Sequence, residues 1–413
     1  MTTQVSNCRL DIVRKMERMR IRSVTVFIKK TSAKLELDLQ AAGQLAQSIK
    51  TRLVDAGYEV QTTRLAMPPV AEWFGSQSDA ALIEAAKHLE STAKANGIDY
   101  VSIGPVGPER LAVLPELLAQ TQTIFTSAAI TDAKQNVLTR ILPAIAQSVV
   151  EISHATPQGF GNLRICASAC CPAGTPFFPV AYSNASLHGT FALAMESADL
   201  ALEACRAASS TTAAMETLTF SILAHSGKIE KALGDFLPLF GGFDWSLAPH
   251  PDESCSIGAA LEQLSGTPVG GWGTLTSVAA LTRAIRRAQV KHVGFSGVFL
   301  PVLEDAVLAR RAADQSYNLQ SLLLFSSVCG AGLDTIPLPG DVSAESISAL
   351  LADVATLATV LAKPLTVRLM PVPGLTAGQR TPFDFPYLIN TTPLELKGAA
   401  GKLLRDERVW MGI

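Results

Sequence analysis

The 413-residue sequence lacks any uninterrupted apolar run of the length that crosses a lipid bilayer, about 20 residues. It also lacks an excess of charge, because 34 basic and 36 acidic side chains leave a net charge of −2. Such a balance provides no electrostatic footprint for nucleic acid or for an anionic membrane surface. We therefore expect neither partner, while the 48% hydrophobic content predicts a large folded core and is compatible with a homodimer.

Signatures of secretion, zinc binding and nucleotide binding are also missing. The seven cysteines are an odd number, and residues 1–22 are polar and basic, without the apolar segment of a signal peptide. Reduced thiols in the cytoplasm fit these features best. Cys166, Cys170 and Cys171 have no second pair at zinc spacing. No Walker or dinucleotide fingerprint occurs, so we expect no nucleotide or flavin; the glycine-rich stretch 270–274 is only a weak candidate for anion binding.

Strand-like and helix-like patterns alternate along the chain. Strands are predicted at 23–28, 57–65, 99–104, 123–130, 160–168, 242–249, 293–300 and 365–369, and helices at 37–56, 80–96, 111–119, 141–152, 192–209, 257–264 and 277–288. This βα alternation predicts a largely parallel sheet, and eight to ten strands favour an α/β barrel over an open sheet. We divide the chain into an N-terminal extension (1–22), one large barrel (23–395, with halves at 23–155 and 156–395) and a C-terminal tail (396–413).

One stretch near the C-terminus has the order strand, loop and helix. The apolar run 322–328 predicts a strand buried on both faces. The loop 329–341 is rich in glycine and proline and contains Cys329 and Asp334. A helix is predicted at 347–361, with Ser343 as its N-cap. Because ligands of α/β folds bind at the carboxyl ends of strands, this loop is the best single candidate for a site.

Long motifs of the chain resemble a known family. They are Phe160-Gly161-Asn162-Leu163-Arg164, the run 172–182, the run 243–249, the run 296–305, and Val328-Cys329-Gly330-Ala331-Gly332-Leu333-Asp334 with Pro339-Gly340-Asp341. They are similar to the domain-of-unknown-function 711 family, often labelled "PFL family proteins", over about residues 20–395. The resemblance implies a ten-stranded α/β barrel of two half-barrels, similar to pyruvate formate-lyase. It implies little about activity, because one fold hosts many functions.

Glycyl-radical chemistry needs a cysteine in a barrel loop and a C-terminal loop that carries the radical glycine. Cys329 is the candidate for the first role. The chain lacks an Arg-Val-x-Gly-Tyr-like run, so no radical site is recognisable and we do not expect a glycyl-radical enzyme. Cys329 can instead be a nucleophile or ligand, or a small hydrophobic residue of the core.

Five carboxylates follow predicted strands and are candidate ligands for Mg²⁺ or Ca²⁺. They are Asp244, Glu304, Asp305, Asp334 and Asp341. Strand ends of a barrel converge at one mouth, and both ions prefer oxygen ligands. The same groups can serve as general acid and base, for which we select Asp334 and Asp244. The alternative is that Glu304, Asp305 and Asp341 only stabilise helix N-termini.

The remaining candidates are a histidine and seven residues of predicted strands and of the loop 329–341. His250 can be an acid/base or a solvated loop residue. Arg368 on a strand either pairs with a carboxylate or binds an anionic substrate. The candidate substrate-binding residues are Asn162, Arg164, Ser296, Gly297, Gly330, Gly332 and Arg368.

Two functions of different classes remain open. The first is an enzyme that acts on a small anionic metabolite, a carboxylate or phosphate, by metal-assisted or acid/base chemistry at the barrel mouth. The second is a non-catalytic regulatory protein that binds a metabolite. Converging carboxylates with an arginine favour the first, and the absence of a complete catalytic signature keeps the second open.

Overall fold

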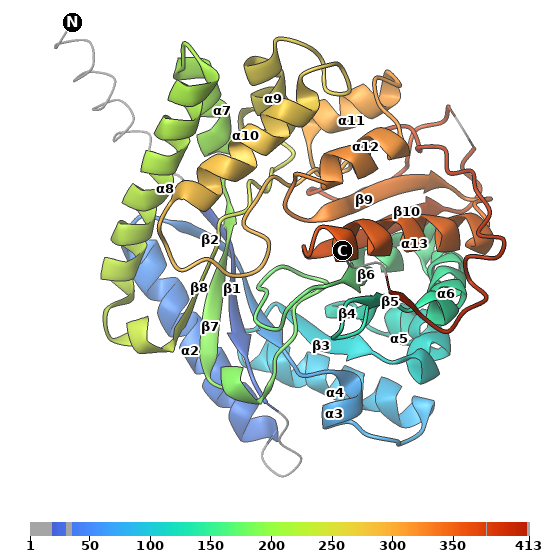
Figure 1. Ribbon diagram of the computed structural model, residues 1–413. Coiled ribbons are helices and arrows are strands. Elements are labelled where there is room, and N and C mark those ends of the chain that lie inside the picture. The colour runs from blue at the N-terminus through green and yellow to red at the C-terminus, as the bar shows by residue number, and fades with distance from the viewer. Residues whose placement is uncertain (1–18, 30–34, 377, 411–413) are drawn as a thin grey trace, which may run out of the picture.

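The computed structural model describes residues 19–29, 35–376 and 378–410, and it is a mixed α/β structure with a large sheet. Figure 1 shows the helices arranged around the outside of the strands. The strands are β1 (Arg20–Phe27), β2 (Glu59–Ala66), β3 (Tyr100–Val106), β4 (Ile124–Ala129), β5 (Asn136–Val137), β6 (Ile165–Ala169), β7 (Thr190–Glu196), β8 (Phe240–Asp244), β9 (Gly332–Pro339), β10 (Leu365–Val372) and β11 (Val409–Trp410).

The helices connect these strands. They are α2 (Leu35–Asp55), α3 (Val70–Trp73), α4 (Asp79–Ala95), α5 (Leu114–Gln120), α6 (Leu142–Ala155), α7 (Ala198–Ala207), α8 (Thr211–Leu233), α9 (Ile257–Ser265), α10 (Thr274–Arg287), α11 (Ala306–Ala313), α12 (Leu319–Ser326) and α13 (Ala344–Val360). Short 3₁₀ helices include η2 (Pro108–Val113) and η4 (Pro157–Arg164). No helix of the described ranges is long and apolar enough to cross a membrane.

The large sheet has nine strands in the order β8-β7-β1-β2-β3-β4-β6-β10-β9. The five central strands β1, β2, β3, β4 and β6 are parallel to one another, as the βα alternation predicted. On each side a parallel pair runs in the opposite direction: β7 pairs with β1 and β10 pairs with β6 in antiparallel fashion. The predicted C-terminal tail contributes β11, which pairs with β5 in a separate two-stranded sheet.

An extended segment, residues 292–301, bridges the two outermost strands of the sheet. Its residues form isolated parallel bridges with β8 and the residues after it, at Phe243–His292 and Leu247–Val298. A further parallel bridge, Pro301–Asp334, joins the same segment to β9. The segment therefore makes backbone contacts on the β8 side and on the β9 side.

Each strand separates two chemically different surroundings. Along β1, Val24 and Val26 pack in the main core with the helices, whereas Phe27 lies in a separate apolar cluster. Thr25, which alternates with them, donates to the carbonyl oxygen of Pro176 over 2.9 Å. Because successive side chains of a strand point to opposite faces, the sheet has an outer face against the helices and an inner face with polar groups. The loop between β6 and β7, which contains Pro176, lies on this inner face.

The predicted strand at 322–328 is wrong. Residues 322–326 belong to α12, which begins after Asn318, the N-cap that forms a capping box with Ser321, and which leaves Leu324 54% exposed. A short run of leucines fits a helix as well as a strand, and the cap decides between them. The strand β9 forms instead from residues that we predicted as a loop. Gly332 starts it with φ of +98°, and the prolines 337 and 339 are tolerated because β9 ends the sheet.

The other predicted elements agree with the structure to different degrees. The helix after Ser343 is confirmed, and the Ser343 side chain accepts a hydrogen bond from the Ser346 amide. The single helix predicted at 192–209 is wrong, because β7 occupies its first part and α7 begins only after Ser197. Most of the predicted N-terminal extension lies outside the described residues, and β1 already begins at Arg20.

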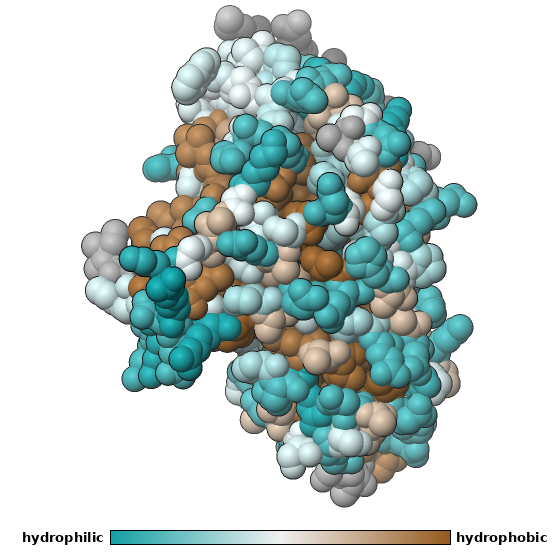
Figure 2. Space-filling model, turned by 90° about the vertical axis from the view of Figure 1, so that its right-hand side faces the viewer, coloured by the Kyte–Doolittle hydropathy of each residue, from teal (hydrophilic) through white to brown (hydrophobic). Residues whose placement is uncertain are grey.

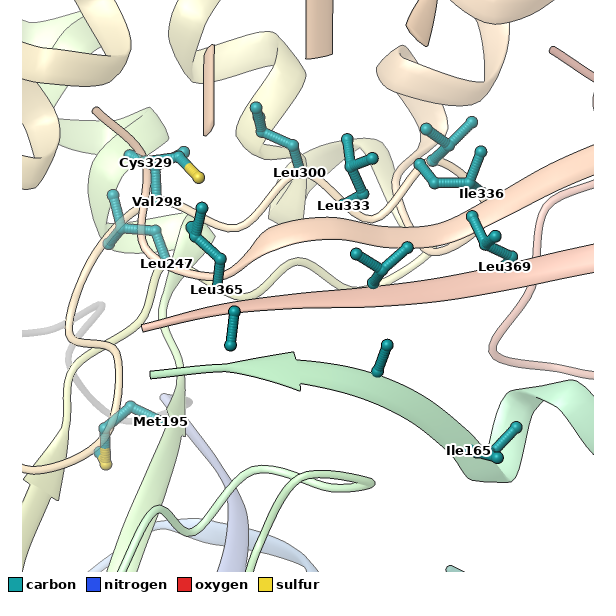
Figure 3. Close-up of a cluster of buried hydrophobic side chains, with 14 of the residues drawn as sticks. Ile165, Met195, Leu247, Val298, Leu300, Cys329, Leu333, Ile336, Leu365 and Leu369 are labelled. Atoms are coloured by element: carbon teal, nitrogen blue, oxygen red, sulfur yellow. The ribbon is translucent and has the colours of Figure 1, made fainter. Parts of the chain in front are cut away.

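The main hydrophobic core lies between the sheet and the helices. Figure 3 shows part of it, where side chains of β9 and β10 meet those of the 292–301 segment. Cys329 is completely buried in this cluster, together with Val298 and Leu365. On the molecular face shown in Figure 2, hydrophobic and hydrophilic side chains are interspersed.

Replacing Gly332 by alanine tests the strand that the sequence did not reveal. A Cβ atom there would lie 2.5 Å from the carbonyl oxygen of Thr366 on β10, at a positive φ. Gly374 has a comparable φ of +78° but open space around it, so Gly374→Ala is the matched control. We expect the control to lose about 1–2 kcal/mol of unfolding free energy and Gly332→Ala a further ~1–3 kcal/mol. Equal losses in denaturant titrations would contradict the β9–β10 packing.

Candidate functional site

A cavity on the inner face gathers charged and aromatic side chains from distant parts of the chain. It encloses about 770 Å³ of empty space, including its opening to solvent. Its lining residues are Arg22, Gln61, Thr62, Arg64, Tyr100, Phe125, Leu163, Phe177, Phe178, Phe299, Glu304, Asp334, Arg368, Phe385, Tyr387 and Leu388.

Arg368 of β10 forms the centre of a buried ion-pair network. Its Nε donates to Asp334 Oδ1 over 2.6 Å, and its NH2 donates to Glu304 Oε1 over 2.7 Å. Burial lowers the pKa of Arg368, but the charges of the two carboxylates outweigh burial and raise it above the usual value. Glu304 Oε2 accepts from Arg22 NH2 of β1 over 2.6 Å. Both oxygens of Glu304 are thus occupied by guanidinium groups.

The network continues from the cavity toward the surface. Arg22 Nε lies 3.9 Å from Glu196 Oε2 at the end of β7, and Arg20 NH1 lies 3.3 Å from Glu196 Oε1. Arg20 Nε also pairs with Glu59, whose side chain is 61% exposed. Alternating charges are the arrangement that makes several buried ions tolerable, because each charge has an opposite neighbour.

An irregularity of β9 orients Asp334 toward Arg368. The pairing register with β10 advances three residues on β9, from Leu333 to Ile336, but only two on β10. Thr335 is the neighbour of Asp334 within this bulge and has φ of +43°. Bulges re-aim side chains and are common beside functional sites. Asp334 is therefore on a strand and not in the predicted loop, yet it does line the cavity.

Arg64 of β2 is the charged group of the cavity without a counter-ion. It is only 7% exposed, and within the described chain no carboxylate lies at ion-pair distance from it. Its Nε donates to Thr62 Oγ1 over 2.9 Å, and its terminal nitrogens have no hydrogen-bond acceptor among the described residues. The guanidinium carbon lies 5.1 Å from the ring centroid of Phe178 and 5.6 Å from that of Tyr100. Burial, and then the positive charge of Arg22, lower the pKa of Arg64.

The two carboxylates of the cavity differ in how many of their oxygens are occupied. Asp334 uses Oδ1 for Arg368, and its Oδ2 accepts no hydrogen bond from any described residue. Asp334 Oδ2 is not among the fully buried atoms that lack a partner. It is therefore in contact with the open cavity. Glu304, in contrast, is held at both oxygens. Asp334 is consequently the carboxylate of the cavity that has an oxygen open to a ligand.

The other predicted metal ligands lie outside this cavity. Asp244 is buried and accepts hydrogen bonds from the amides of Phe295 and Ser296, each over 2.8 Å. Burial raises the pKa of Asp244 to about 6. Asp305 caps α11 and also accepts from the amide of Ile257 over 2.6 Å. These bonds show that both carboxylates hold backbone segments together.

The structure does not bring the five predicted ligands together as one metal centre. Asp341 is exposed in the turn after β9. Within residues 19–29, 35–376 and 378–410, no group of three or more His, Cys, Asp or Glu side chains is arranged to hold a metal ion. The cavity carboxylates Glu304 and Asp334 are paired with arginines instead.

Cys329 and His250 have different relations to the cavity. Cys329 is fully buried in the core, and its Sγ accepts from the Gly332 amide over 3.4 Å, so it has no access to a cavity ligand. His250 makes an edge contact with the cavity residue Tyr387, with ring centroids 6.0 Å apart. Burial, and then the charges of Arg20 and Arg22, lower the pKa of His250. Its acid/base role stays a prediction.

Two of the predicted substrate-binding side chains stabilise the connection into β6. Asn162 Nδ2 donates to the carbonyl oxygen of Val149 in α6 over 3.0 Å. Arg164 donates to Thr121 Oγ1 over 3.2 Å and to the carbonyl of Leu118. Neither lines the cavity. Arg164 is committed to backbone carbonyls and a buried hydroxyl, whereas Asn162 Oδ1 is buried without a partner among the described residues.

The predicted substrate-binding residues of the segment 292–301 and of the former loop 329–341 lie where backbones approach each other closely. A Cβ on Gly297 would lie 2.7 Å from the Cα of Gly330, so these two segments need glycine where they cross. Ser296 has φ of +41°, and its Oγ lies 3.2 Å from His292 Nδ1. Gly332 opens β9, as described above. These residues position the segments that carry Phe299, Glu304 and Asp334.

Sequence reasoning missed Arg22 and Arg64. We expected from the sequence that Arg368, an arginine on a strand, either pairs with a carboxylate or binds an anion. The same expectation holds for Arg64 on β2. Alternation along that strand also places Arg64 on the same side as Thr62 and Ala66. The aromatic lining could not be found in this way, because its rings come from loops as well as strands.

Replacing Arg368 by methionine should strongly destabilise the protein. The change leaves the negative charges of Asp334 and Glu304 buried without the positive charge of Arg368. Breaking a buried ion pair costs about 3–5 kcal/mol of unfolding free energy. The control is Arg310→Met, which breaks the exposed pair with Glu253 and should cost less than about 1 kcal/mol. Chemical denaturation of both variants measures the difference. Similar stabilities would contradict the central role of Arg368.

Comparison with known proteins identifies relatives across most of the chain. The UPF0210 protein of Oenococcus oeni is 28% identical over 378 residues, which cover 86% of this chain and 83% of that protein. A UPF0210 protein of Pyrobaculum aerophilum is 31% identical over 363 residues, covering 82% and 79% of the two chains. The family model described as Uncharacterised ACR (DUF711) matches residues 13–385. The chain belongs to this family, as its motifs led us to expect.

Proposed function

We propose that the cavity binds a small anionic metabolite and that the protein is an enzyme that transfers a proton to or from it. The observation that carries the proposal is Arg64, a buried guanidinium whose terminal nitrogens have no acceptor among the described residues. These nitrogens are not among the fully buried atoms, so they face the open cavity, and an arginine fork matches a carboxylate or phosphate in a bidentate manner. A bound anion supplies the missing partner.

Asp334 is the proposed general base or acid. Its Oδ2 is open to the cavity, while the bond from Arg368 to Oδ1 fixes the carboxylate in place. Glu304 is the positioning residue, since it holds Arg368 and Arg22 in a fixed relation. General acid/base catalysis needs this combination of an accessible carboxylate and a rigid support. A divalent ion, Mg²⁺ or Ca²⁺, would be held by the open oxygen of Asp334 and would supply positive charge to polarise the substrate.

The fold of the proposed enzyme is a closed barrel. Support comes from the segment 292–301, which bridges to β8 and to β9 and so acts as a tenth strand. Closure would give one mouth at which strand ends converge, the usual place of active sites in barrels. The likeness to pyruvate formate-lyase belongs to the same proposal. The six described cysteines are free thiols, which agrees with a reducing cytoplasm.

The second candidate is a regulatory protein that binds the same anion without turnover. It is favoured by the location of Cys329, which removes the one candidate nucleophile from the cavity. Both functions require Arg64, but only the enzyme requires a proton-transfer role for Asp334. The two variants described next therefore separate them.

Arg64→Gln should weaken anion binding without unfolding the protein. A hydrogen bond to a charged group is worth about 1.5–3 kcal/mol, so we expect a roughly ten- to hundredfold loss of affinity. Small carboxylates and phosphate esters would be screened by thermal shift, and hits titrated by calorimetry. Arg310→Gln, at an exposed site outside the cavity, should bind as the wild type does. Unchanged affinity of Arg64→Gln would exclude the anion site.

Asp334→Asn should retain ligand binding and lose turnover. Asparagine is nearly isosteric and keeps one acceptor oxygen for Arg368, but it cannot accept a proton at neutral pH. We expect kcat to fall by about 10²–10⁴-fold for the compound that the wild type converts, the contribution typical of general acid/base catalysis. Turnover is measured by mass spectrometry on the hits of the screen. Full activity of the variant contradicts the base assignment, and bound compounds that the wild type never converts favour the regulatory protein.

A further inference from the structure

We propose that the anion is an aromatic monocarboxylate, an inference that rests on the proposed anion site and names its ligand class. Two independent features of the cavity carry it. One is the sum of the buried charges, and the other is the set of rings around the uncompensated arginine. Together they define the charge of the ligand and the nature of its body.

A ligand with one negative charge balances the charges of the cavity. Three guanidinium groups line it, and two carboxylates oppose them, Glu304 and Asp334. The sum is one positive charge, which remains at Arg64 because Arg22 and Arg368 are already paired. A monoanion neutralises the cavity. A phosphate dianion would leave a second buried negative charge unpaired, which is costly in an apolar site.

The surroundings of Arg64 place the body of the ligand against aromatic rings. Arg64 lies over Phe178 and beside Tyr100, so a carboxylate bound to it enters among these rings. Phe178 packs edge-to-face on Phe125, with centroids 5.3 Å apart. The pair Phe177–Phe299, 4.7 Å apart, lines the same cavity. Preassembled rings offer the tilted and edge contacts that another aromatic ring prefers.

The cavity offers few free hydrogen-bonding groups to the body of a ligand. The hydroxyl of Thr62 is occupied, since it accepts from Arg64 and donates to the carbonyl oxygen of Arg22 over 2.8 Å. Beyond the charged residues, the remaining polar side chains of the lining are Gln61 and the hydroxyls of Tyr100 and Tyr387. A sugar or another polyhydroxylated body would bury unpaired polar groups here. An apolar ring has no polar groups of its own that would be left unpaired.

Calorimetric titration of the full chain with benzoate and four matched compounds tests the inference. Benzamide keeps the ring and shape but removes the charge, and acetate keeps the charge but removes the ring. Cyclohexanecarboxylate replaces the flat ring by a puckered one, and phenyl phosphate at pH 8 is a dianion, because its second pKa is about 6. We expect benzoate to bind about tenfold or more tightly than benzamide, acetate and phenyl phosphate, and several-fold more tightly than cyclohexanecarboxylate.

The variant Arg64→Gln assigns the binding to this cavity. It should reduce the affinity for benzoate to that for benzamide, with benzamide binding unchanged. Benzamide, acetate or phenyl phosphate binding as tightly as benzoate to the wild type would overturn the aromatic monocarboxylate, while anion binding that depends on Arg64 would leave the proposed function standing. No binding of any of these anions and no effect of Arg64→Gln would overturn both.

Discussion

The double pairing of Arg368 with Asp334 and Glu304 is the interaction on which the arrangement of the cavity depends. Arg368 is on β10, Asp334 is on β9, and Glu304 follows the 292–301 segment and contacts Arg22 of β1. Four chain segments that are far apart in sequence are therefore tied by two carboxylates. Arg368, Asp334 and Glu304 are buried and Arg22 is partly buried, so the loss of a partner carries a large energetic cost. The network fixes the geometry of the site before any ligand enters.

Arg64 stands apart from this network because it has the burial of a structural arginine but no counter-ion in the part of the chain that the structure describes. The protein compensates it only in part, through the faces of Phe178 and Tyr100 and one hydroxyl. A cation over an aromatic face is stabilised by roughly 0.5–2 kcal/mol, less than a buried ion pair provides when it is well placed. The cavity is thus stable enough to form, and the positive charge that remains at Arg64 is the basis of the proposed anion site.

Much of the outer architecture follows from local patterns. The parallel strands of the first half and the helices between them were predicted because apolar residues recur at strand and helix spacing, as in β1 and α2. The failures occurred where two patterns compete. The leucine run of α12 satisfies both a buried strand and a short helix, and the cap at Asn318 decides for the helix. Residues 332–339 contain glycine and prolines, which locally indicate a loop, but pairing with β10 makes them a strand.

The sequence by itself determined the family and the α/β alternation, and it singled out Asp334, Glu304 and Arg368 as candidates, because motifs and periodicity are local properties. Only the tertiary structure decided how these residues act. Arg368 could pair with a carboxylate or bind a substrate, and the pairing with β9 brings Asp334 to it and selects the first role. The same structure places Cys329 in the core and Asp244 against a loop, where their chemistry serves packing. The unpaired state of Arg64 depends on every neighbour in space, and no local pattern contains that information.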